Sequence, residues 1–442
     1  LSAYRTRVSK EEIKVFVDHV AGWLSGILVL VTLVGVLGAP LLATIFAPGY
    51  RGDPEKFVLL VDMLRITFPY ILLISLTGFA GAILNSYGRF AAPALTPVLL
   101  NLVLISSAVL LSPLFEQPVM ALAWGVLMAG LLQLMFQLPF LAHLRLVPRP
   151  RLRPGHPGVR QVLTLMLPIM FSVSVGQINL LLDTVLATSI EGDSSVSWLY
   201  YSDRLMELPL GIFGIAIATV ILPTLSRLHG SGDEAQFSRT LAWGLRSVLV
   251  LGLPACLALI LLSHPLVITL YQRGEFGVDS IVPTASSLQA YSVGLVAFMS
   301  IKILVSAFFS RQDSHTPVRI GVIALVCNMA LNLLLIIPLA HVGLALATSL
   351  AAIINAGLLL WTLQKRGLAP ASAGWLVFGL RLAGGLLAMI LVLQLLAQPD
   401  ELWIARGELQ RIGQLLLTCA LGGSAYLAGL WLCGLRVAHF RL

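Results

Sequence analysis

Long apolar runs separated by short polar segments dominate this chain. Most runs extend over about 20 residues, the length that an α-helix needs to cross the hydrocarbon core of a bilayer. The runs are continuous and do not alternate between apolar and polar positions, which disfavours a transmembrane β-barrel. The pattern predicts twelve membrane-spanning helices, at about 20–46, 57–85, 93–113, 118–143, 161–189, 196–226, 239–270, 283–309, 317–339, 342–364, 374–397 and 410–435.

The composition agrees with an all-α polytopic membrane protein. The 442 residues are 58% hydrophobic and only 11% charged, and their mean hydropathy is +0.94. Soluble domains carry roughly 25% charged residues. The predicted spans follow one another too closely for a separate soluble domain. No GxxxxGK[ST], HExxH or GxSxG motif is present, so we expect a transporter and not an enzyme.

The net charge of +8 is explained by its distribution. Lys and Arg concentrate in alternate loops, beginning with the N-terminal segment, and the richest loop is HLRLVPRPRLRPGHPGVR at 143–160. The positive-inside rule then predicts that both termini are cytoplasmic. Because topology accounts for the charge, we expect no nucleic-acid partner. The four cysteines all fall within predicted spans, where we interpret them as packing residues.

Two halves of the chain resemble each other. GAPLLATIFAPGYRG (38–52) resembles SHPLVITLYQRGEFG (263–277), and NSYGRFAAPAL (85–95) lies opposite FSRQDSHTPVR (309–319). Repeats that run in the same direction predict two parallel lobes, related by an axis along the membrane normal. The first half holds four spans and the second six, so we expect two further helices before residue 1; the alternative is that the halves are unequal. The predicted domains are an N-terminal lobe at 1–145, a basic cytoplasmic linker at 146–160, a C-terminal lobe at 161–366 and a two-helix appendage at 367–442.

Charged side chains within spans are the candidates for function. Asp203, Arg204 and Glu207 lie near the start of span 196–226. A charge at bilayer depth costs a few kcal/mol at least and usually faces the interior of a bundle. A guanidinium matches two oxygens of a carboxylate or phosphate, so one interpretation is that Arg204 binds an anionic cargo and the two acids orient it. The alternative is a self-satisfied ion cluster in which Arg204 pairs with Glu207.

Lys302, in the middle of span 283–309, is a further candidate for the cargo. The alternative is a cation whose stem lies along apolar surface while its ammonium reaches water.

A second group of residues could hold a cation. Asp183 is a lone carboxylate in span 161–189, and such a group needs a cation or a proton. Asn328 and Asn332 are four residues apart and share a helix face, and Thr348 adds a hydroxyl. These oxygens suit sodium, a hard cation. The alternative is that the two Asn side chains join helices while Asp183 is protonated or hydrogen-bonded. We expect no other cofactor.

Three stretches, at 68–101, 197–227 and 291–318, resemble the MurJ/MviN lipid II flippases of the MOP exporter superfamily. The resemblance covers essentially the whole chain, and DRLMELPLG at 203–211 is a specific part of it. It implies a MOP/MATE-like bundle of two six-helix lobes and a two-helix appendage. Of these fourteen helices, twelve would be present here.

The resemblance also implies a function. The family transports lipid II, a peptidoglycan precursor linked through pyrophosphate to a polyprenyl chain, across the bacterial inner membrane by alternating access. Arg204 falls on an arginine of the family's cationic cavity, and the appendage at 374–435 would form a groove for the polyprenyl tail. The sodium site of some members corresponds to Asp183, Asn328, Asn332 and Thr348.

The family's other cavity arginines lie in its first two helices, which have no counterpart here. We expect a monomer in contact with membrane lipids. The alternatives to a lipid II flippase are a MOP exporter of drugs or of another polyprenyl-linked oligosaccharide, and an inactive fragment.

Overall fold

The computed structural model describes residues 9–151, 164, 166, 170, 174, 177–178, 180–190, 194–368 and 374–435. Every regular element within these ranges is helical, so the all-α prediction is confirmed for them. The chain divides into two compact units, Leu1–Ser174 and Val175–Leu442. The finer domain limits expected from the sequence stay a prediction.

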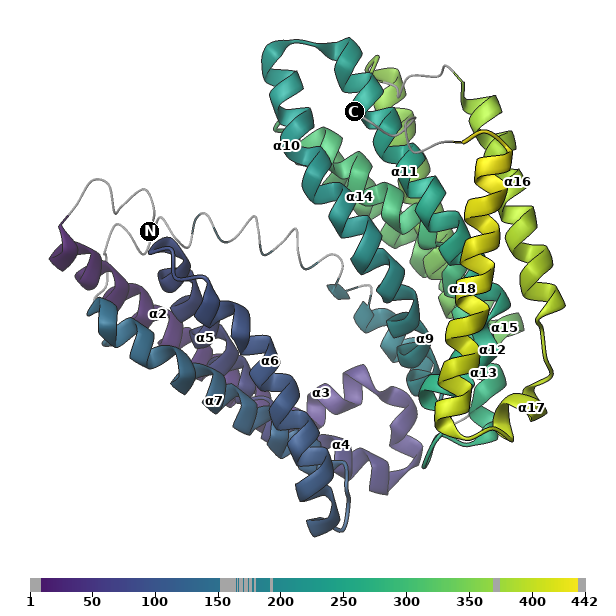
Figure 1. Ribbon diagram of the computed structural model, residues 1–442. Helices are drawn as coiled ribbons and strands as arrows, with labels where there is room; N and C mark the ends of the chain where they lie inside the picture. Colours follow the sequence, from purple (N-terminus) through teal and green to yellow (C-terminus); the bar gives the residue numbers. More distant parts are fainter. Residues whose placement is uncertain are drawn as a thin grey trace. The chain divides into compact units, whose positions relative to one another are not determined.

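The first unit is a bundle of long helices. Its α2 (Lys10–Leu37) begins with a capping box, in which Ser9 Oγ accepts a hydrogen bond from the backbone N–H of Glu12 and Glu12 accepts one from that of Ser9. Both α5 and α6 pack against α7, and α2 packs against α5 (Figure 1). The remaining elements are α3 (Ala39–Phe46), α4 (Pro54–Thr67), α5 (Tyr70–Ser86), α6 (Ala91–Ser106) and α7 (Met120–Leu144).

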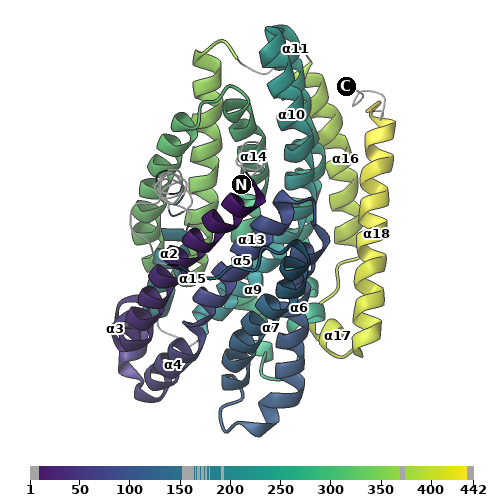
Figure 2. The same cartoon turned by 90° about the vertical axis from the view of Figure 1, so that its left-hand side faces the viewer.

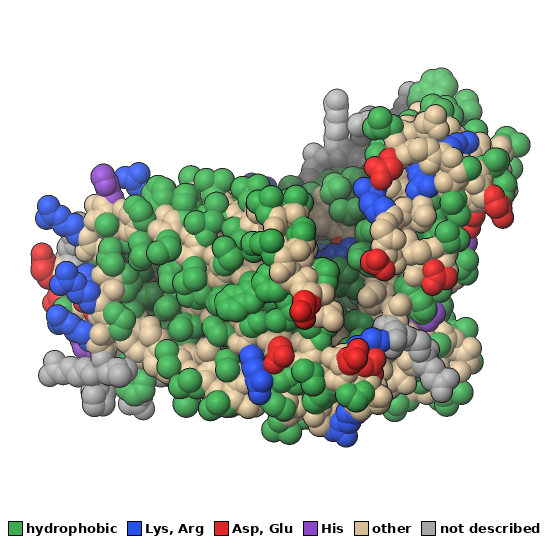
Figure 3. All heavy atoms as spheres, turned by 90° about the horizontal axis from the view of Figure 1, so that it is seen from below, with side chains coloured by type: hydrophobic (Ala, Val, Ile, Leu, Met, Phe, Trp, Pro, Cys, Tyr) green, Lys and Arg blue, Asp and Glu red, His purple; other side chains and the backbone are tan. Residues whose placement is uncertain are grey.

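Polar contacts inside this bundle join helices, while its outside is apolar. The side-chain amide of Gln133 on α7 donates to the carbonyl oxygen of Thr96 on α6 over 2.7 Å. Leu102 and Ile105 of α6, by contrast, are exposed. Figure 3 shows a broad field of hydrophobic side chains, with Lys, Arg and His side chains gathered at its left end. Such an apolar exterior suits contact with lipid tails.

The second unit begins with a helical segment at 180–188. A proline and a π-turn interrupt its next span, because Pro209 ends α9 and the wider turn Leu210–Gly214 leads into α10. The core of the unit is formed by residues such as Phe237, Leu288 and Ile303. Its helices before the appendage are α9 (Ser195–Pro209), α10 (Ile215–Ser231), α11 (Glu234–Leu261), α12 (Ser263–Tyr271), α13 (Ile281–Val293), α14 (Leu295–Phe309) and α15 (His315–Lys365).

α15 is a hairpin of two arms. Its 51 residues would extend about 77 Å if the helix were straight. Arg366, directly after its end, nevertheless lies 2.6 Å from Asp313, two residues before its start, measured from Nη1 to Oδ2. The chain reverses at Ala340, whose φ of 47° and ψ of −128° interrupt the helix soon after Pro338. The predicted boundary between spans 317–339 and 342–364 falls at this kink.

The membrane-spanning character of the chain is supported, but the predicted number of spans is not confirmed. Ten helices among the described residues are long and apolar enough to cross a bilayer. The count of ten takes α15 as one helix although it folds back on itself. Most of the predicted span 161–189 lies outside the described residues.

The last three helices form an appendage in which the two long helices pack against each other. α16 (Trp375–Leu395) and α18 (Glu408–Leu432) lie side by side in Figures 1 and 2, with the short α17 (Asp400–Ile404) between them in the chain. They approach closely because glycines face each other: a Cβ on Gly429 would lie 2.9 Å from the Cα of Gly385. The hydroxyl of Tyr426 donates to the carbonyl oxygen of Val250 over 2.7 Å, which fastens α18 to α11.

Candidate functional site

Two charged residues of α9, Arg204 and Glu207, form an accessible ion pair. Tyr200, Arg204 and Glu207 are three or four positions apart and therefore share one face of the helix. Arg204 Nη1 lies 2.6 Å from Glu207 Oε2, and the guanidinium lies over the Tyr200 ring, 5.0 Å from its centroid. The predicted Arg204–Glu207 pair is thus confirmed. The two side chains are 54% and 48% exposed, so their pairing leaves them accessible.

The opposite face of α9 is fixed to the unit. Ser202 is buried, and its hydroxyl donates to the carbonyl oxygen of Thr284 on α13 over 2.8 Å. Leu205 and Met206 are buried beside it. This packing sets the rotation of α9, and with it the direction in which Arg204 points.

Asp203, four positions before Glu207 in α9, lines a cavity. A cavity of about 190 Å³ is lined by side chains that include Asp183, Asp203, Tyr291 and Thr348. Tyr200 also lines it, and the ring that carries the Arg204 guanidinium therefore forms part of its wall. The structure thus brings Asp203 to the predicted cation-binding group, which the sequence interpretation had placed with the cargo.

All four residues of the predicted cation site lie together. Asn332 Nδ2 donates to Asp183 Oδ1 over 2.6 Å and to Asn328 Oδ1 over 3.0 Å. The Thr348 hydroxyl lies 3.3 Å from Asp183 Oδ2 and 3.1 Å from the carbonyl oxygen of Leu344, and its one proton can be donated to either. Asn328 Nδ2 donates to Thr348 Oγ1, also over 3.3 Å. The residues come from the segment 180–188 and from both arms of α15, so the kink at Ala340 is what brings Thr348 to Asn328.

The oxygen atoms of this network suit a small hard cation. The group offers the Asp183 carboxylate, two amide oxygens and the Thr348 hydroxyl, and sodium accepts ligands of these types. Asn332 is fully buried, and its Oδ1 has no hydrogen-bond partner. A buried acceptor without a donor is costly, and a cation would satisfy it. The alternative interpretation, in which the two Asn side chains join helices, uses the same hydrogen bonds.

Lys302 is not brought to either group by any described contact. It is exposed on α14, and it is absent from the side chains that line the cavity. Its assignment to the cargo stays a prediction. Sequence reasoning missed Tyr200 and Tyr291. The signal for Tyr200 was its place four residues before Arg204, where an aromatic ring can lie under a guanidinium.

A larger cavity, of about 290 Å³, lies in the first unit and is lined by residues that include Arg89, Phe140 and His143. It contains none of the predicted site residues.

Comparison with known proteins identifies one family. The sequence model of the family described as lipid II flippase MurJ matches residues 1–406. The chain is 42% identical, over its whole length, to a probable lipid II flippase MurJ of Vibrio cholerae, of which it covers 85%. It is 37% identical, again over its whole length, to the lipid II flippase MurJ of Burkholderia cenocepacia, of which it covers 86%.

Two solved structures share the fold. A lipid II flippase MurJ in an inward closed conformation aligns with a TM-score of 0.76 and 24% identity, over 96% of this chain and 86% of that one. An inward-facing multidrug resistance MATE transporter of the MOP superfamily aligns with a TM-score of 0.62 and 16% identity, over 80% of this chain and 82% of that one. At these identities the likeness concerns the fold alone.

Proposed function

This chain belongs to the family of the lipid II flippase MurJ, and we therefore propose that it carries lipid II from the inner to the outer leaflet of the bacterial cytoplasmic membrane. The whole-length match to that family is the observation that carries the proposal. The names of the curated relatives support lipid II as the cargo over a drug or another polyprenyl-linked oligosaccharide.

The chemistry of the cargo explains why a protein is required. Lipid II joins a polar sugar–peptide head to a polyprenyl chain through a pyrophosphate. Taking charges and unpaired polar groups into hydrocarbon costs many kcal/mol, so the head needs a hydrated, cationic route while the tail stays in lipid. A membrane potential that is negative inside favours outward movement of an anion, by about 2.3 kcal/mol per charge per 100 mV.

Arg204 is the residue that we assign to the pyrophosphate. Its side chain is accessible, and Glu207 and Tyr200 fix its direction. Glu207 contacts one terminal nitrogen of a guanidinium that carries five N–H groups, so donors remain for phosphate oxygens. Release on the other side requires that the contact between Arg204 and the pyrophosphate weaken when the transporter changes state. A residue that binds the cargo equally well in both states would not drive its release.

We assign Asp183, Asn328, Asn332 and Thr348 to a sodium ion. Their oxygen atoms fit, and the buried Oδ1 of Asn332 is left without a donor. A bound sodium ion would supply one positive charge beside the Asp183 carboxylate. Without it, Asn332 and Thr348 hold that carboxylate by hydrogen bonds.

The topology belongs to the same proposal. We propose twelve spans with both ends of the chain in the cytoplasm. The candidate spans and the hairpin of α15 support the number, and the distribution of Lys and Arg supports the orientation. We propose a monomer because a single chain contains both predicted repeats.

A transport assay tests the proposal. Purified protein in liposomes should move fluorescent lipid II to the opposite leaflet, and it should do so poorly when Arg204 is replaced by Ala. In cells depleted of their own lipid II flippase, the gene should restore lipid II at the outer leaflet, and Arg204→Ala should not. Movement of a drug but not of lipid II would contradict the proposed cargo. Full transport by Arg204→Ala would contradict the role of the arginine.

A further inference from the structure

The cavity beside α9 holds two carboxylates that differ in their partners. Asp183 is hydrogen-bonded by Asn332 and Thr348. Asp203 lines the same cavity, yet within the described residues its carboxylate takes part in no ion pair and no hydrogen bond that the structure contains. An ionised carboxylate without a partner in a membrane span is costly. The cavity therefore carries more negative charge than its own residues neutralise.

A second observation indicates a cation as the missing partner. Asn332 is completely buried against Asp183, with its Oδ1 unsatisfied. Two carboxylates line the cavity, and the residue with the orphaned amide oxygen is hydrogen-bonded to one of them; all three groups favour a positive ion. N–H donors of the protein satisfy only some of these oxygen atoms, because the side-chain amide of Asn332 already donates to Asp183 and Asn328.

The same charges act on Arg204. Asp203 and Arg204 are consecutive in α9, and Tyr200 both lines the cavity and lies under the guanidinium. Arg204 is thus paired with Glu207 and adjacent to Asp203 in the helix, and Asp203 shares the cavity with Asp183. Coulomb interactions between neighbouring charges are strong in a medium of low effective dielectric constant. With the cavity carboxylates uncompensated, an anionic headgroup that approaches Arg204 meets an excess of negative charge.

We propose that Asp203 couples the cation cavity to Arg204, so that a cation bound beside Asp203 and Asp183 increases the affinity of Arg204 for the pyrophosphate of the cargo. Asp203 acts here as a positioning residue for charge and touches the cation, not the headgroup. This inference rests on the proposed function, because it takes the pyrophosphate as the anion at Arg204.

Thermodynamic linkage requires that the coupling act in both directions. If the cation raises the affinity for the anion by some factor, the anion must raise the affinity for the cation by the same factor. Coupled sites usually influence each other roughly 5- to 150-fold. Loading of cargo and cation would then be cooperative, and a headgroup would bind poorly to a protein without the ion.

The experiment measures binding and not transport. The dissociation constant of lipid II is determined for purified full-length chain in sodium chloride and in choline chloride at equal ionic strength. We expect lipid II to bind roughly 5- to 150-fold more tightly in sodium. In Asp203→Asn, affinity in choline should rise toward the wild-type value in sodium, and the dependence on sodium should become small. Glu275→Gln is the matched control, because it removes an exposed acid of the same unit outside the cavity.

A reciprocal measurement needs no variant. Binding of radioactive sodium to the wild-type protein should tighten in the presence of lipid II, by the factor found for lipid II in sodium. Lipid II binding that ignores sodium, or full sodium dependence in Asp203→Asn, would overturn the coupling and leave the proposed function standing. Absence of lipid II binding in both salts would overturn the proposed function and the coupling together.

Discussion

Asn332 donates a hydrogen bond to Asp183 over 2.6 Å, although 149 residues separate the two in sequence. The same amide nitrogen also donates to Asn328 Oδ1, one helical turn earlier. A half-buried carboxylate is therefore held by an amide that is itself fixed within α15. This contact fastens the segment 180–188 to the hairpin at the candidate cation site.

Removal of that amide should destabilise the protein. In Asn332→Ala, Asp183 and Asn328 lose a donor in a buried setting, which costs about 1–3 kcal/mol and more when the acceptor is charged. We expect the unfolding temperature of Asn332→Ala to fall below that of the wild type in choline chloride. In sodium chloride the decrease should be smaller if the ion compensates the charge of the Asp183 carboxylate. Scanning fluorimetry of the purified protein measures both.

Asn101→Ala is the control for this variant. Asn101 is exposed on α6, and exposed substitutions usually change stability by less than about 0.5 kcal/mol. Equal unfolding temperatures for Asn332→Ala and Asn101→Ala would show that the network contributes nothing.

The sequence predicted the members of this network but not its geometry. Apolar runs locate the spans, and the i, i+4 spacing places Asn328 and Asn332 on one face. Thr348 reaches them because α15 reverses at Ala340, and the turn geometry there is set by local backbone conformation that a hydropathy pattern does not contain. The assignment of Asp203 to the cargo stays a prediction. Its place at the cavity could not be read from the sequence, because tertiary packing, here the Ser202–Thr284 hydrogen bond, decides which residues of α9 face the cavity.

Even a conservative substitution of Arg204 should weaken the binding of lipid II. Arg204→Lys keeps the positive charge but loses the planar fork and its stacking on Tyr200. Hydrogen bonds to charged groups contribute about 1.5–3 kcal/mol each, so we expect lipid II to bind roughly ten- to a hundredfold more weakly in Arg204→Ala. Arg204→Lys should lie between Ala and wild type. Equilibrium binding to the purified variants gives these values.

The control for Arg204 is an arginine elsewhere on the same unit. Arg319 is exposed on α15, and its guanidinium forms no hydrogen bond that the described structure contains. Arg319→Ala removes the same charge and should bind lipid II like the wild type. A similar loss in both variants would mean that general positive charge, and not the site at α9, attracts the cargo.

The appendage contains a buried cation that sequence reasoning did not single out. Arg411 on α18 is only 9% exposed. Its guanidinium donates to the carbonyl oxygens of Trp403, Ile404 and Arg406 around the end of α17. It also donates to Gln272 Oε1 over 2.6 Å. No sequence spacing relates Gln272 to Arg411, so this contact could be found only from the structure.

Loss of Arg411 should loosen the appendage. In Arg411→Ala several buried or partly buried acceptors lose their donor at once, and we expect a cost of about 2–4 kcal/mol. A lysine carries one ammonium on a flexible stem and cannot donate to all of these carbonyl oxygens, which lie in different directions. Arg411→Lys should therefore restore little of the lost stability. Hydrogen–deuterium exchange should rise in α17 and at the start of α18. Protection unchanged from the wild type would show that apolar packing alone holds the appendage.

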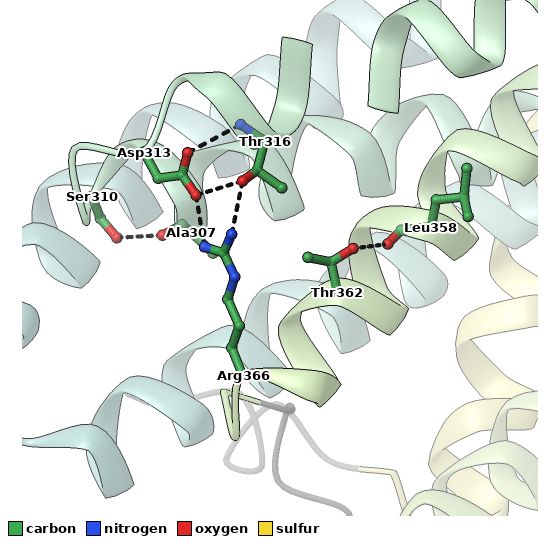
Figure 4. Close-up of polar contacts among 7 residues, drawn as sticks. All are labelled: Ala307, Ser310, Asp313, Thr316, Leu358, Thr362 and Arg366. Atoms are coloured by element: carbon green, nitrogen blue, oxygen red, sulfur yellow. Dashed lines mark hydrogen bonds and ion pairs between the residues drawn. The ribbon is translucent and has the colours of Figure 1, made fainter. Parts of the chain in front are cut away.

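A carboxylate in the loop before α15 should make the stability of the protein depend on pH. Partial burial raises the pKa of Asp313, but hydrogen bonds from the Thr316 hydroxyl and backbone N–H and from Arg366 outweigh it and lower the pKa to about 2. Figure 4 shows these contacts, with Arg366 reaching back from the far end of α15 to Asp313 and Thr316. The carboxylate thereby joins the two ends of the hairpin.

Because the folded pKa lies below the ordinary value of 3.8, the folded state binds this proton less readily than the unfolded state does. The stabilisation is present above about pH 4 and is lost as the pH falls toward about 2. Asp313→Asn should therefore lower the unfolding temperature near neutral pH and weaken its fall between pH 4 and 2. The pair is partly exposed, so the effect should be about 1 kcal/mol or less. Unfolding temperatures measured from pH 5 to 2 for wild type, Asp313→Asn and the control Glu275→Gln test this, and parallel curves for all three would refute a role for Asp313 in closing the hairpin.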